Sequence, residues 1–391
     1  MPLLLLSLLD FFTVEPGPMP ELTALDGAFS EAPVDHWRVR LPERHPSGSH
    51  TELSRPTAAG RSIFVGIAAV NALVELDRAT GEVVHRYAAM APVQSEPVVQ
   101  GGLLTFTDGA GYTWRYDVGA DEPTWSHFGG APITSAPSVS GTRVYVSSVD
   151  DVVYALEATT GELIWRYARP QDPSRSSELS LFGSPSPVEA GRLVLAGFSD
   201  GALVALDAGD GEVNWERRVG EGRYPDLIAT PLVVGSDCYV GGYSEPLVSV
   251  DLASRNVRWR LDVGSAASPT LVGEVLYHGA TDGKLRAIDR QTGATLWTWD
   301  SETTGALTQP QALDAGLLVS SSDGSMYIVD PDGSLVWEYD PGFLLAGITV
   351  APVIVGRQLV AVTNAGWIMS LLSPRSSVIR RDPLLGADAP L

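Results

Sequence analysis

The chain has 391 residues, of which 44% are hydrophobic, and it carries a formal net charge of −21 at pH 7. Because nucleic acids and anionic membrane surfaces attract clustered lysine and arginine, this balance argues against either as a partner. The single cysteine, Cys238, cannot form an internal disulfide and is expected to be a buried, inert thiol. No spacing of His, Cys, Asp or Glu resembles a metal site and no catalytic motif is found, so neither a metal nor a cofactor is predicted.

The first 32 residues differ from the rest of the chain. Residues 3–9 form an apolar run of the kind seen in export signals, but no basic residue precedes the run and Asp10 follows it. The run is also too short to span a bilayer. A shortened or misassigned export signal, an amphipathic anchor and a loose segment packed on the main domain all remain open. The Pro-rich residues 14–20 are typical of a linker.

From residue 33 onward the chain is built from repeats. An eleven-residue cassette, Ala-x-Asp-x-x-Thr-Gly-x-x-x-Trp, returns with a period of roughly 40 residues. Its clearest copies are ALEATTGELIW at 155–165, ALDAGDGEVNW at 205–215 and AIDRQTGATLW at 287–297. Worn copies occupy 74–85, 250–259 and 329–337. A fixed period of this length predicts an array of similar structural units.

A second mark, a proline followed four residues later by glycine, recurs along the chain, and the number of these marks gives the number of units. It occurs at Pro56, Pro97, Pro137, Pro187, Pro231, Pro269 and Pro352, and Pro310 belongs to the series with a longer turn that ends at Gly316. Between the marks, apolar and polar residues alternate with the period of two that is typical of strands packed on one face. The sequence therefore predicts eight units of β structure and no helices.

Each unit is expected to hold four antiparallel strands. Asp-Gly pairs at 200–201, 282–283 and 323–324 predict tight hairpins, because such turns require positive φ. The Thr-Gly turn of the cassette then leads into a fourth strand that carries a tryptophan. Four short strands per repeat are typical of a propeller blade. We expect a structural role for the tryptophans, wedged between blades with the indole N–H bonded to backbone, rather than a ligand-stacking role: Trp37, Trp165, Trp215, Trp259, Trp297 and Trp337.

The two chain ends are predicted to close the ring. Residues 36–40 resemble an outer strand with no inner strands before it, whereas the eighth unit, 352–372, supplies only three strands. Trp37 would then complete the last blade, with residues 377–380 as the competing candidate for that strand. We therefore predict an all-β, eight-bladed β-propeller over residues 33–373, closed by an N-terminal strand, with an apolar segment and linker at 1–32 and a tail at 374–391.

These repeats resemble a known family. The cassette is similar to the tryptophan-docking repeat of the pyrroloquinoline-quinone propellers, and the closing strand is similar to that of the outer-membrane β-barrel assembly factor BamB. Residues 178–184 resemble the segment with which that family engages the periplasmic domains of BamA, and residues 223–226 resemble a neighbouring loop with an acidic contact. The resemblance implies apolar contacts by Leu179 and Leu181 and an acidic contact by Asp226.

Two positions depart from the family pattern. Phe182 stands where the family usually has arginine, and Ile228 stands where it has a second aspartate. These departures concern the identity of the partner rather than the place of the surface. The resemblance otherwise implies a non-enzymatic scaffold without a transmembrane span, a monomer within a larger complex, at the periplasmic face of the outer membrane or in the periplasm.

Loop length points to the same surface independently. The connections at 168–183 and 217–229 are longer than the others and are expected to leave adjacent blades on one face. Leu179, Leu181 and Phe182 would present an apolar patch there, with Arg223 and Asp226 as its polar rim. The alternative is that the leucines fold back onto the propeller.

Two further functions stay open at this point. The same repeat builds quinone-dependent dehydrogenases, but these need a calcium ligand set and often a vicinal disulfide, and neither can be identified in this sequence. A ligand-sensing or adhesion propeller with an unknown partner is the other alternative, because a fold by itself does not fix a function.

Overall fold

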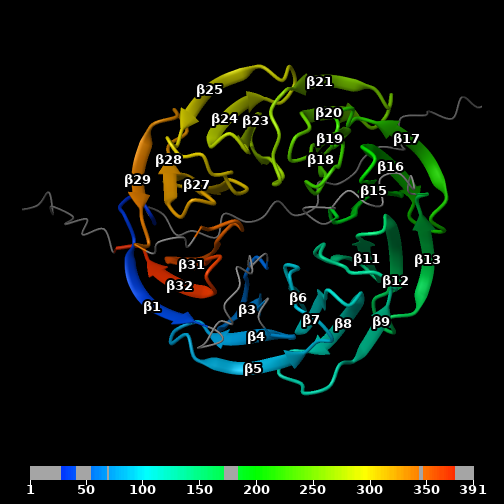
Figure 1. Ribbon diagram of the computed structural model, residues 1–391, viewed down its shortest axis with the longest axis horizontal. Coiled ribbons are helices and arrows are strands. Elements are labelled where there is room, and N and C mark those ends of the chain that lie inside the picture. The colour runs from blue at the N-terminus through cyan, green and yellow to red at the C-terminus, as the bar shows by residue number, and fades with distance from the viewer. Residues whose placement is uncertain (1–27, 41–53, 68–69, 171–183, 343–346, 375–391) are drawn as a thin grey trace, which may run out of the picture.

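The computed structural model describes residues 28–40, 54–67, 70–170, 184–342 and 347–374. Within these residues the chain forms eight four-stranded antiparallel sheets, and Figure 1 shows them arranged as blades around a ring. The predicted eight-bladed propeller is thus confirmed. No helix able to cross a membrane occurs in the described parts of the chain.

Blades 1 to 4 follow one another in chain order. Blade 1 contains β2 (Thr57–Ala59), β3 (Ser62–Ile67), β4 (Ala72–Asp77) and β5 (Val83–Ala88). Blade 2 contains β6 (Val98–Gln100), β7 (Leu103–Thr107), β8 (Tyr112–Asp117) and β9 (Trp125–Phe128). Blade 3 contains β10 (Ser138–Ser140), β11 (Arg143–Ser148), β12 (Val152–Glu157) and β13 (Leu163–Ala168). Blade 4 contains β14 (Val188–Ala190), β15 (Leu193–Gly197), β16 (Ala202–Asp207) and β17 (Val213–Arg218).

Blades 5 to 7 repeat this order, and blade 8 joins both ends of the ring. Blade 5 contains β18 (Leu232–Val234), β19 (Asp237–Val240), β20 (Leu247–Asp251) and β21 (Val257–Leu261). Blade 6 contains β22 (Thr270–Val272), β23 (Val275–Gly279), β24 (Lys284–Asp289) and β25 (Thr295–Asp300). Blade 7 contains β26 (Gln311–Leu313), β27 (Gly316–Ser320), β28 (Met326–Val329) and β29 (Leu335–Tyr339). Blade 8 contains β30 (Val353–Val355), β31 (Gln358–Val362), β32 (Trp367–Leu372) and β1 (Val34–Arg40).

The hydrophobic core lies between neighbouring blades. In blade 4 the third strand, β16, is buried over most of its length, whereas the outer strand β17 buries only Trp215. One cluster joins Tyr145 and Trp165 of blade 3 to Val194 and Val204 of blade 4. Because each sheet packs on two neighbours, every blade is stabilised from both faces.

The docking tryptophans share one geometry. Trp165 Nε1 donates a hydrogen bond to the Ala208 carbonyl at 2.9 Å, in the cassette turn of the next blade. Its ring packs on Gly211, where an added Cβ would come within 2.6 Å of the ring and φ is +76°. Glycine is therefore required there for two reasons, close approach and positive φ. The same indole bond joins Trp37 to the Arg78 carbonyl, Trp259 to that of Arg290 and Trp297 to that of Pro331.

Blade 5 departs from this geometry. Arg255, with φ of 65°, stands in its cassette turn at the position that Gly161, Gly211 and Gly293 hold in blades 3, 4 and 6. Trp215 is 6% exposed and packs with Val248 and Val250 of this blade. The ring of Trp215 is thus buried against the next blade although the turn residue differs.

Trp125 docks as well, although the sequence analysis did not include it. Its Nε1 donates to the Ala158 carbonyl at 2.9 Å and its ring packs on Gly161. The available signal was Asp117, which precedes Trp125 by the same eight residues that separate Asp207 from Trp215. The glycine of this turn is displaced to position 119, which breaks the cassette pattern.

The N-terminal strand closes the ring as predicted. β1 pairs antiparallel with β32, with Trp37 opposite Ser370 and an irregularity between Asp35 and Trp37. In Figure 1, β1 lies along the rim outside β32. The competing segment, residues 377–380, lies outside the described residues.

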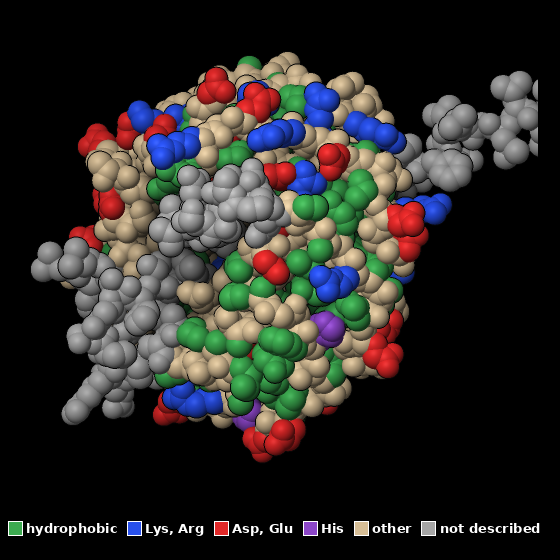
Figure 2. Space-filling model, turned by 45° about the vertical axis from the view of Figure 1, so that its right-hand side comes forward, with side chains coloured by type: hydrophobic (Ala, Val, Ile, Leu, Met, Phe, Trp, Pro, Cys, Tyr) green, Lys and Arg blue, Asp and Glu red, His purple; other side chains and the backbone are tan. Residues whose placement is uncertain are grey.

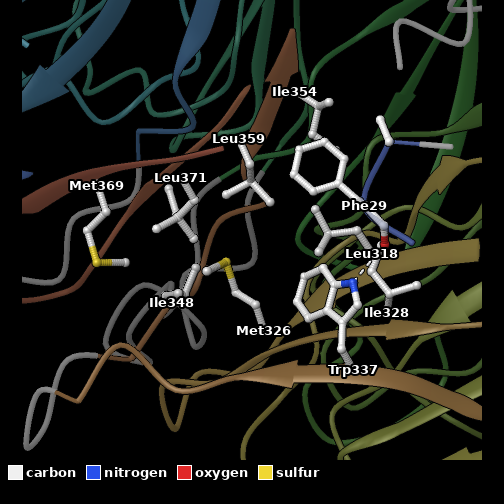
Figure 3. Close-up of a cluster of buried hydrophobic side chains, with 12 residues drawn as sticks. Phe29, Leu318, Met326, Ile328, Trp337, Ile348, Ile354, Leu359, Met369 and Leu371 are labelled. Carbon is white, nitrogen blue, oxygen red and sulfur yellow. Dashed lines mark hydrogen bonds between the residues drawn. The ribbon is translucent and has the colours of Figure 1, made fainter. Parts of the chain in front are cut away.

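A second contact at the closure lies just before β1. Trp337 of blade 7 has no cassette turn to dock on, because the fourth strand of blade 8 comes from the other end of the chain. Its Nε1 instead donates to the Phe29 carbonyl at 2.8 Å, as the dashed line in Figure 3 shows. Phe29 is fully buried, has φ of 63° and donates its own N–H to Ser373 Oγ at 2.7 Å. Phe29 therefore replaces the missing turn.

Candidate protein-docking surface

The long connections lie on one face of the ring. In a blade of four antiparallel strands, the hairpin between the second and third strands and the connection to the next blade emerge on the same side. We call this side the connection face. The 217–229 connection is described, whereas Leu179, Leu181 and Phe182 lie outside the described residues. The apolar part of the predicted surface therefore stays a prediction.

Arg169 holds the start of the 168–183 connection. Its Nε and Nη2 contact Asp200 Oδ2 at 2.9 and 2.8 Å, and its Nη1 contacts Glu216 Oε2 at 3.0 Å. The guanidinium also lies 5.6 Å from the centre of the Phe198 ring. Burial alone would lower the pKa of Arg169, but the bonds to both carboxylates outweigh it and raise that pKa. Blade 4 thereby fixes the residue at which the connection leaves blade 3.

The other end of this connection is fixed to the hairpins as well. Ser184 Oγ donates to the Ser148 carbonyl at 2.8 Å. In the same hairpin, Asp151 has φ of 62°, and its carboxylate accepts bonds from Ser199 N at 3.1 Å and Ser199 Oγ at 2.5 Å. The hairpins of blades 3 and 4 are therefore bonded directly to each other.

The second connection is a compact loop. We call residues 219–229 the Arg223 loop. Its base is buried through Val219, Leu227 and Ala229, and the Leu227 N–H donates to the Phe198 carbonyl at 3.2 Å. Alternate residues toward its end, including Asp226 and Ile228, are partly exposed. The loop is thus packed on the ring rather than extended into solvent.

Glu245 holds the tip of this loop. The side chain is 4% exposed, and its Oε2 and Oε1 accept bonds from the N–H groups of Glu221 and Gly222 at 3.0 and 2.9 Å. We call residues 241–246, the hairpin that carries Glu245, the Tyr243 hairpin. A Cβ added at Gly242 would lie 2.0 Å from the Asp226 carbonyl oxygen, so the loop and the hairpin are in direct contact. A buried carboxylate bonded to backbone N–H groups makes this contact rigid.

Arginine and tyrosine side chains are exposed on this support. Arg223 lies at the tip with its guanidinium 5.3 Å from the centre of the Tyr224 ring. Tyr224 is 46% exposed, and Tyr243 of the neighbouring hairpin is 39% exposed. The structure thus places Arg223 at an exposed rim, whereas Asp226 is partly buried against the hairpin. Tyr224, Tyr243 and Glu245 belong to no sequence motif that would mark them as site residues.

The surroundings of the loop are rich in arginine. Arg217 and Arg218 end β17, and Arg260 on β21 pairs with Glu221 at 3.4 Å. Figure 2 shows Lys and Arg side chains interspersed with Asp and Glu side chains across the upper half of its view. Carboxylates lie among these arginines, since Glu216, Glu221 and Asp226 belong to the same stretch of chain.

Metal binding and thiol chemistry are the other possibilities in the described parts of the chain. No group of three or more His, Cys, Asp or Glu side chains is placed there to hold a metal ion. Cys238 is fully buried, and burial raises the pKa of its thiol to about 12, so the reactive thiolate is disfavoured. The connection face is therefore the strongest candidate for function.

Comparisons with known proteins agree on one family. The family model described as outer membrane protein assembly factor BamB matches residues 28–134 and 121–299. The BamB of Burkholderia pseudomallei is 29% identical over 324 residues, which cover 80% of this chain and 82% of that protein. The BamB of Alkalilimnicola ehrlichii is 34% identical over 166 residues, so this chain spans 43% of that relative, and it spans 64% of the BamB of Shewanella oneidensis.

Solved structures agree on the fold. The crystal structure of BamB from Moraxella catarrhalis aligns with a TM-score of 0.73 at 20% identity, covering 87% of this chain and 100% of that one. Sqt1 of Saccharomyces cerevisiae aligns with a TM-score of 0.71 at 10% identity, covering 88% and 100%. At such identities the likeness shows the propeller fold alone. The sequence match does more, since it extends from residue 28 to residue 299, and the chain therefore belongs to the family of the outer membrane protein assembly factor BamB.

Proposed function

We propose that this protein is a non-enzymatic scaffold that assists the assembly of outer-membrane β-barrel proteins from the periplasmic side. The observation that carries the proposal is the family match over residues 28–299, a family named for this role. The match favours assembly over the quinone-dependent dehydrogenase and over the sensing or adhesion propeller.

The scaffold would act by holding a partner against the connection face. The partner we propose is the set of periplasmic domains of a BamA-like protein. Leu179, Leu181 and Phe182 would supply apolar contacts, with Arg223 and Asp226 beside them. The bonds of Arg169 and Glu245 support this idea, because loops that are fixed before binding lose little conformational entropy on binding.

The proposal is tested by the double substitution Leu179→Asp with Leu181→Asp. We expect the affinity for the periplasmic domains of the BamA-like protein from the same organism to fall at least about a hundredfold, because two apolar anchors become charged. Leu296→Asp with Leu335→Asp is the matched control, since both leucines are exposed on outer strands, at 55% and 47%. Equal affinity of the two double variants would overturn the assignment of the loop.

A further inference from the structure

Three aromatic side chains form a row on blade 2. Tyr112 and Trp114 alternate along β8 and therefore point to the same side of the strand. Their rings are stacked with centroids 5.1 Å apart, and the ring of Phe128 on β9 lies 4.9 Å from that of Tyr112. Phe128 is 56% exposed, and the other two side chains are partly exposed. Exposed apolar groups that lie together in this way mark interaction sites more often than single ones do.

The row begins in the core between blades 1 and 2 and ends at the surface. Tyr116, two residues after Trp114, is buried against Tyr87 of blade 1 with ring centroids 5.2 Å apart. Trp114 packs against the same cluster but remains partly exposed. Its partner across the strand pair is Ser126, which is itself exposed and too small to cover an indole ring. The outer end of the row is therefore uncovered because the register places serine opposite tryptophan.

Asp108 holds the exposed end of the row in place. Its carboxylate is fully buried, and one oxygen, Oδ2, accepts bonds from both Trp114 Nε1 and the Met90 N–H at 2.9 Å. The other oxygen accepts the Tyr112 N–H at 3.0 Å. Met90, in the connection from blade 1 to blade 2, is 59% exposed. We call Met90, Tyr112, Trp114 and Phe128 the aromatic surface, and its shape is fixed within the folded chain by these bonds.

The aromatic surface lies at the connection face. Met90 belongs to a connection between blades, and Asp108 begins the hairpin between β7 and β8, so both are on that side of the ring. The Ile133 N–H donates to the Asp108 carbonyl at 3.2 Å, and the Val149 N–H donates to the Pro132 carbonyl at 2.9 Å. These bonds join the hairpins of blades 2 and 3, and the hairpins of blades 3 and 4 are bonded in turn. The aromatic surface is thus on the same face as the Arg223 loop but on other blades.

The chemistry of this surface suits a polypeptide segment with aromatic side chains. None of its four side chains carries a charge, and the Asp108 carboxylate behind them is buried and bonded to N–H groups. Aromatic rings pack favourably on one another in offset or edge-to-face pairs. The strands of outer-membrane barrels carry girdles of aromatic residues that lie at the two membrane interfaces. Such strands, before they are folded, therefore expose the side chains that this surface is shaped to accept.

We propose that the aromatic surface holds an unfolded segment of an outer-membrane β-barrel protein by its aromatic side chains. This inference rests on the proposed function, because that function supplies barrel proteins as the molecules to be assembled. It assigns contact with the barrel protein to blade 2 and contact with the BamA-like partner to the connections after blades 3 and 4. One face of the ring then holds both at the same time.

The test uses the full chain and a short labelled peptide in which aromatic and uncharged polar residues alternate, with binding followed by fluorescence anisotropy. Met90→Ser with Phe128→Ser should weaken binding at least about tenfold, because both side chains are exposed and their loss removes contact area while the core stays packed. Leu296→Ser with Leu335→Ser is the matched control, exposed on outer strands at 55% and 47%, and should change the affinity less than about twofold. Phe128→Tyr keeps the ring and should retain binding. Equal effects of the two double variants would overturn the inference.

A second peptide and the partner domains separate the outcomes. A peptide with leucine in place of each aromatic residue should bind more weakly, and equal binding of the two peptides would overturn the inference. Met90→Ser with Phe128→Ser should leave the affinity for the BamA-like periplasmic domains within about twofold of the unsubstituted protein. Binding of those domains without binding of the aromatic peptide would overturn the inference and leave the proposed function intact. Binding of the aromatic peptide without binding of the domains would support the inference and refute the proposed partner.

Discussion

Blades 4 and 8 use the same four strands and the same tryptophan docking, but they obtain them from different parts of the chain. In blade 4, Trp165 docks on Ala208, which lies 43 residues further along. At blade 8, Trp337 docks on Phe29, which is 308 residues away, and the outer strand β1 comes from the N-terminus. The closure therefore reproduces a local blade contact through a long-range one. Breaking equivalent contacts in the two places shows which part of the ring is weaker.

The largest effect is expected from removing a docking tryptophan. Trp165→Ala and Trp337→Ala should each lower the free energy of unfolding by about 3–5 kcal/mol, because both side chains are 6% exposed and leave a large cavity. Chemical denaturation measures this loss. Hydrogen exchange separates the two variants, since only Trp337→Ala should speed exchange of the β1 amides. Unchanged exchange of the β1 amides in Trp337→Ala would contradict a role for the Trp337–Phe29 contact in holding the ring closed.

Acid should destabilise blade 6, whose four strands are consecutive in the chain, through protonation of His278. Burial lowers the pKa of His278 to about 4, and neither of its buried ring nitrogens has a hydrogen-bond partner among the described residues. The unfolded chain, with a His pKa of about 6.5, binds the proton first, so this contribution is complete above pH 6.5 and is lost as pH falls toward 4. The loss amounts to about 3 kcal/mol, measured as unfolding free energy against pH.

The matched pair for this prediction is His278→Leu and His36→Gln. His278→Leu should flatten the stability curve in that pH window, whereas His36→Gln, at an exposed position of β1, should leave the curve as it is in the unsubstituted protein. If His36→Gln flattens the stability curve and His278→Leu does not, the acid-sensitive group lies at the ring closure.

Substitution of Ser373 is a smaller perturbation of the Phe29 contact at the ring closure. Ser373→Ala removes the acceptor of the buried Phe29 N–H and should cost about 1–2 kcal/mol. Ser95→Ala is the equivalent change in blade 2, where Ser95 Oγ accepts from Thr107 N and donates to the Thr107 carbonyl, both at 3.1 Å. Thermal unfolding should show similar losses for both variants. A loss confined to Ser95→Ala would mean that Phe29 is not held by Ser373.

The smallest effect is expected from the surface ion pair of the closing strand. Asp35 contacts Arg38 at 2.8 Å and accepts a bond from the Tyr339 hydroxyl at 2.5 Å, which joins β1 to blade 7. Although partial burial opposes it, the bonds from Tyr339 and Arg38 lower the pKa of Asp35. The side chain is 54% exposed, so Asp35→Ala should cost less than about 1 kcal/mol. Asp282→Ala, which breaks the ion pair with Arg286 in blade 6, is the control. If Asp35→Ala lowers the free energy of unfolding several times more than Asp282→Ala does, the Asp35–Arg38 pair helps to hold the ring closed.

Sequence reasoning succeeded where the signal is local and repeated. The cassettes, the Pro-Gly marks and the isolated strand at 36–40 each predict structure within a few residues, and together they fixed the blade count and the closure. Trp125 was missed because one displaced glycine broke the cassette pattern. Phe29 was missed because its role depends on a partner 308 residues away, for which no local pattern exists.

The candidate site was only partly predictable for the same reason. Loop length and resemblance pointed to Arg223 and Asp226, and the structure places both in the compact Arg223 loop. Glu245 gave no signal, because a single carboxylate in a hairpin looks ordinary until it is found bonded to the backbone of another blade connection. Tyr224 and Tyr243 are exposed on the two elements that Glu245 joins, and their exposure becomes evident only in the folded chain.

We propose that a closed ring presents its connection face to a partner protein. Hydrogen exchange of the full chain, with and without the periplasmic domains of the BamA-like protein, tests it most directly. The account predicts protection of the segments 168–184, 219–229 and 241–246 on binding, with no change in the cassette turns of the opposite face, such as 207–212. Protection of those cassette turns, with the connection face unchanged, would contradict it.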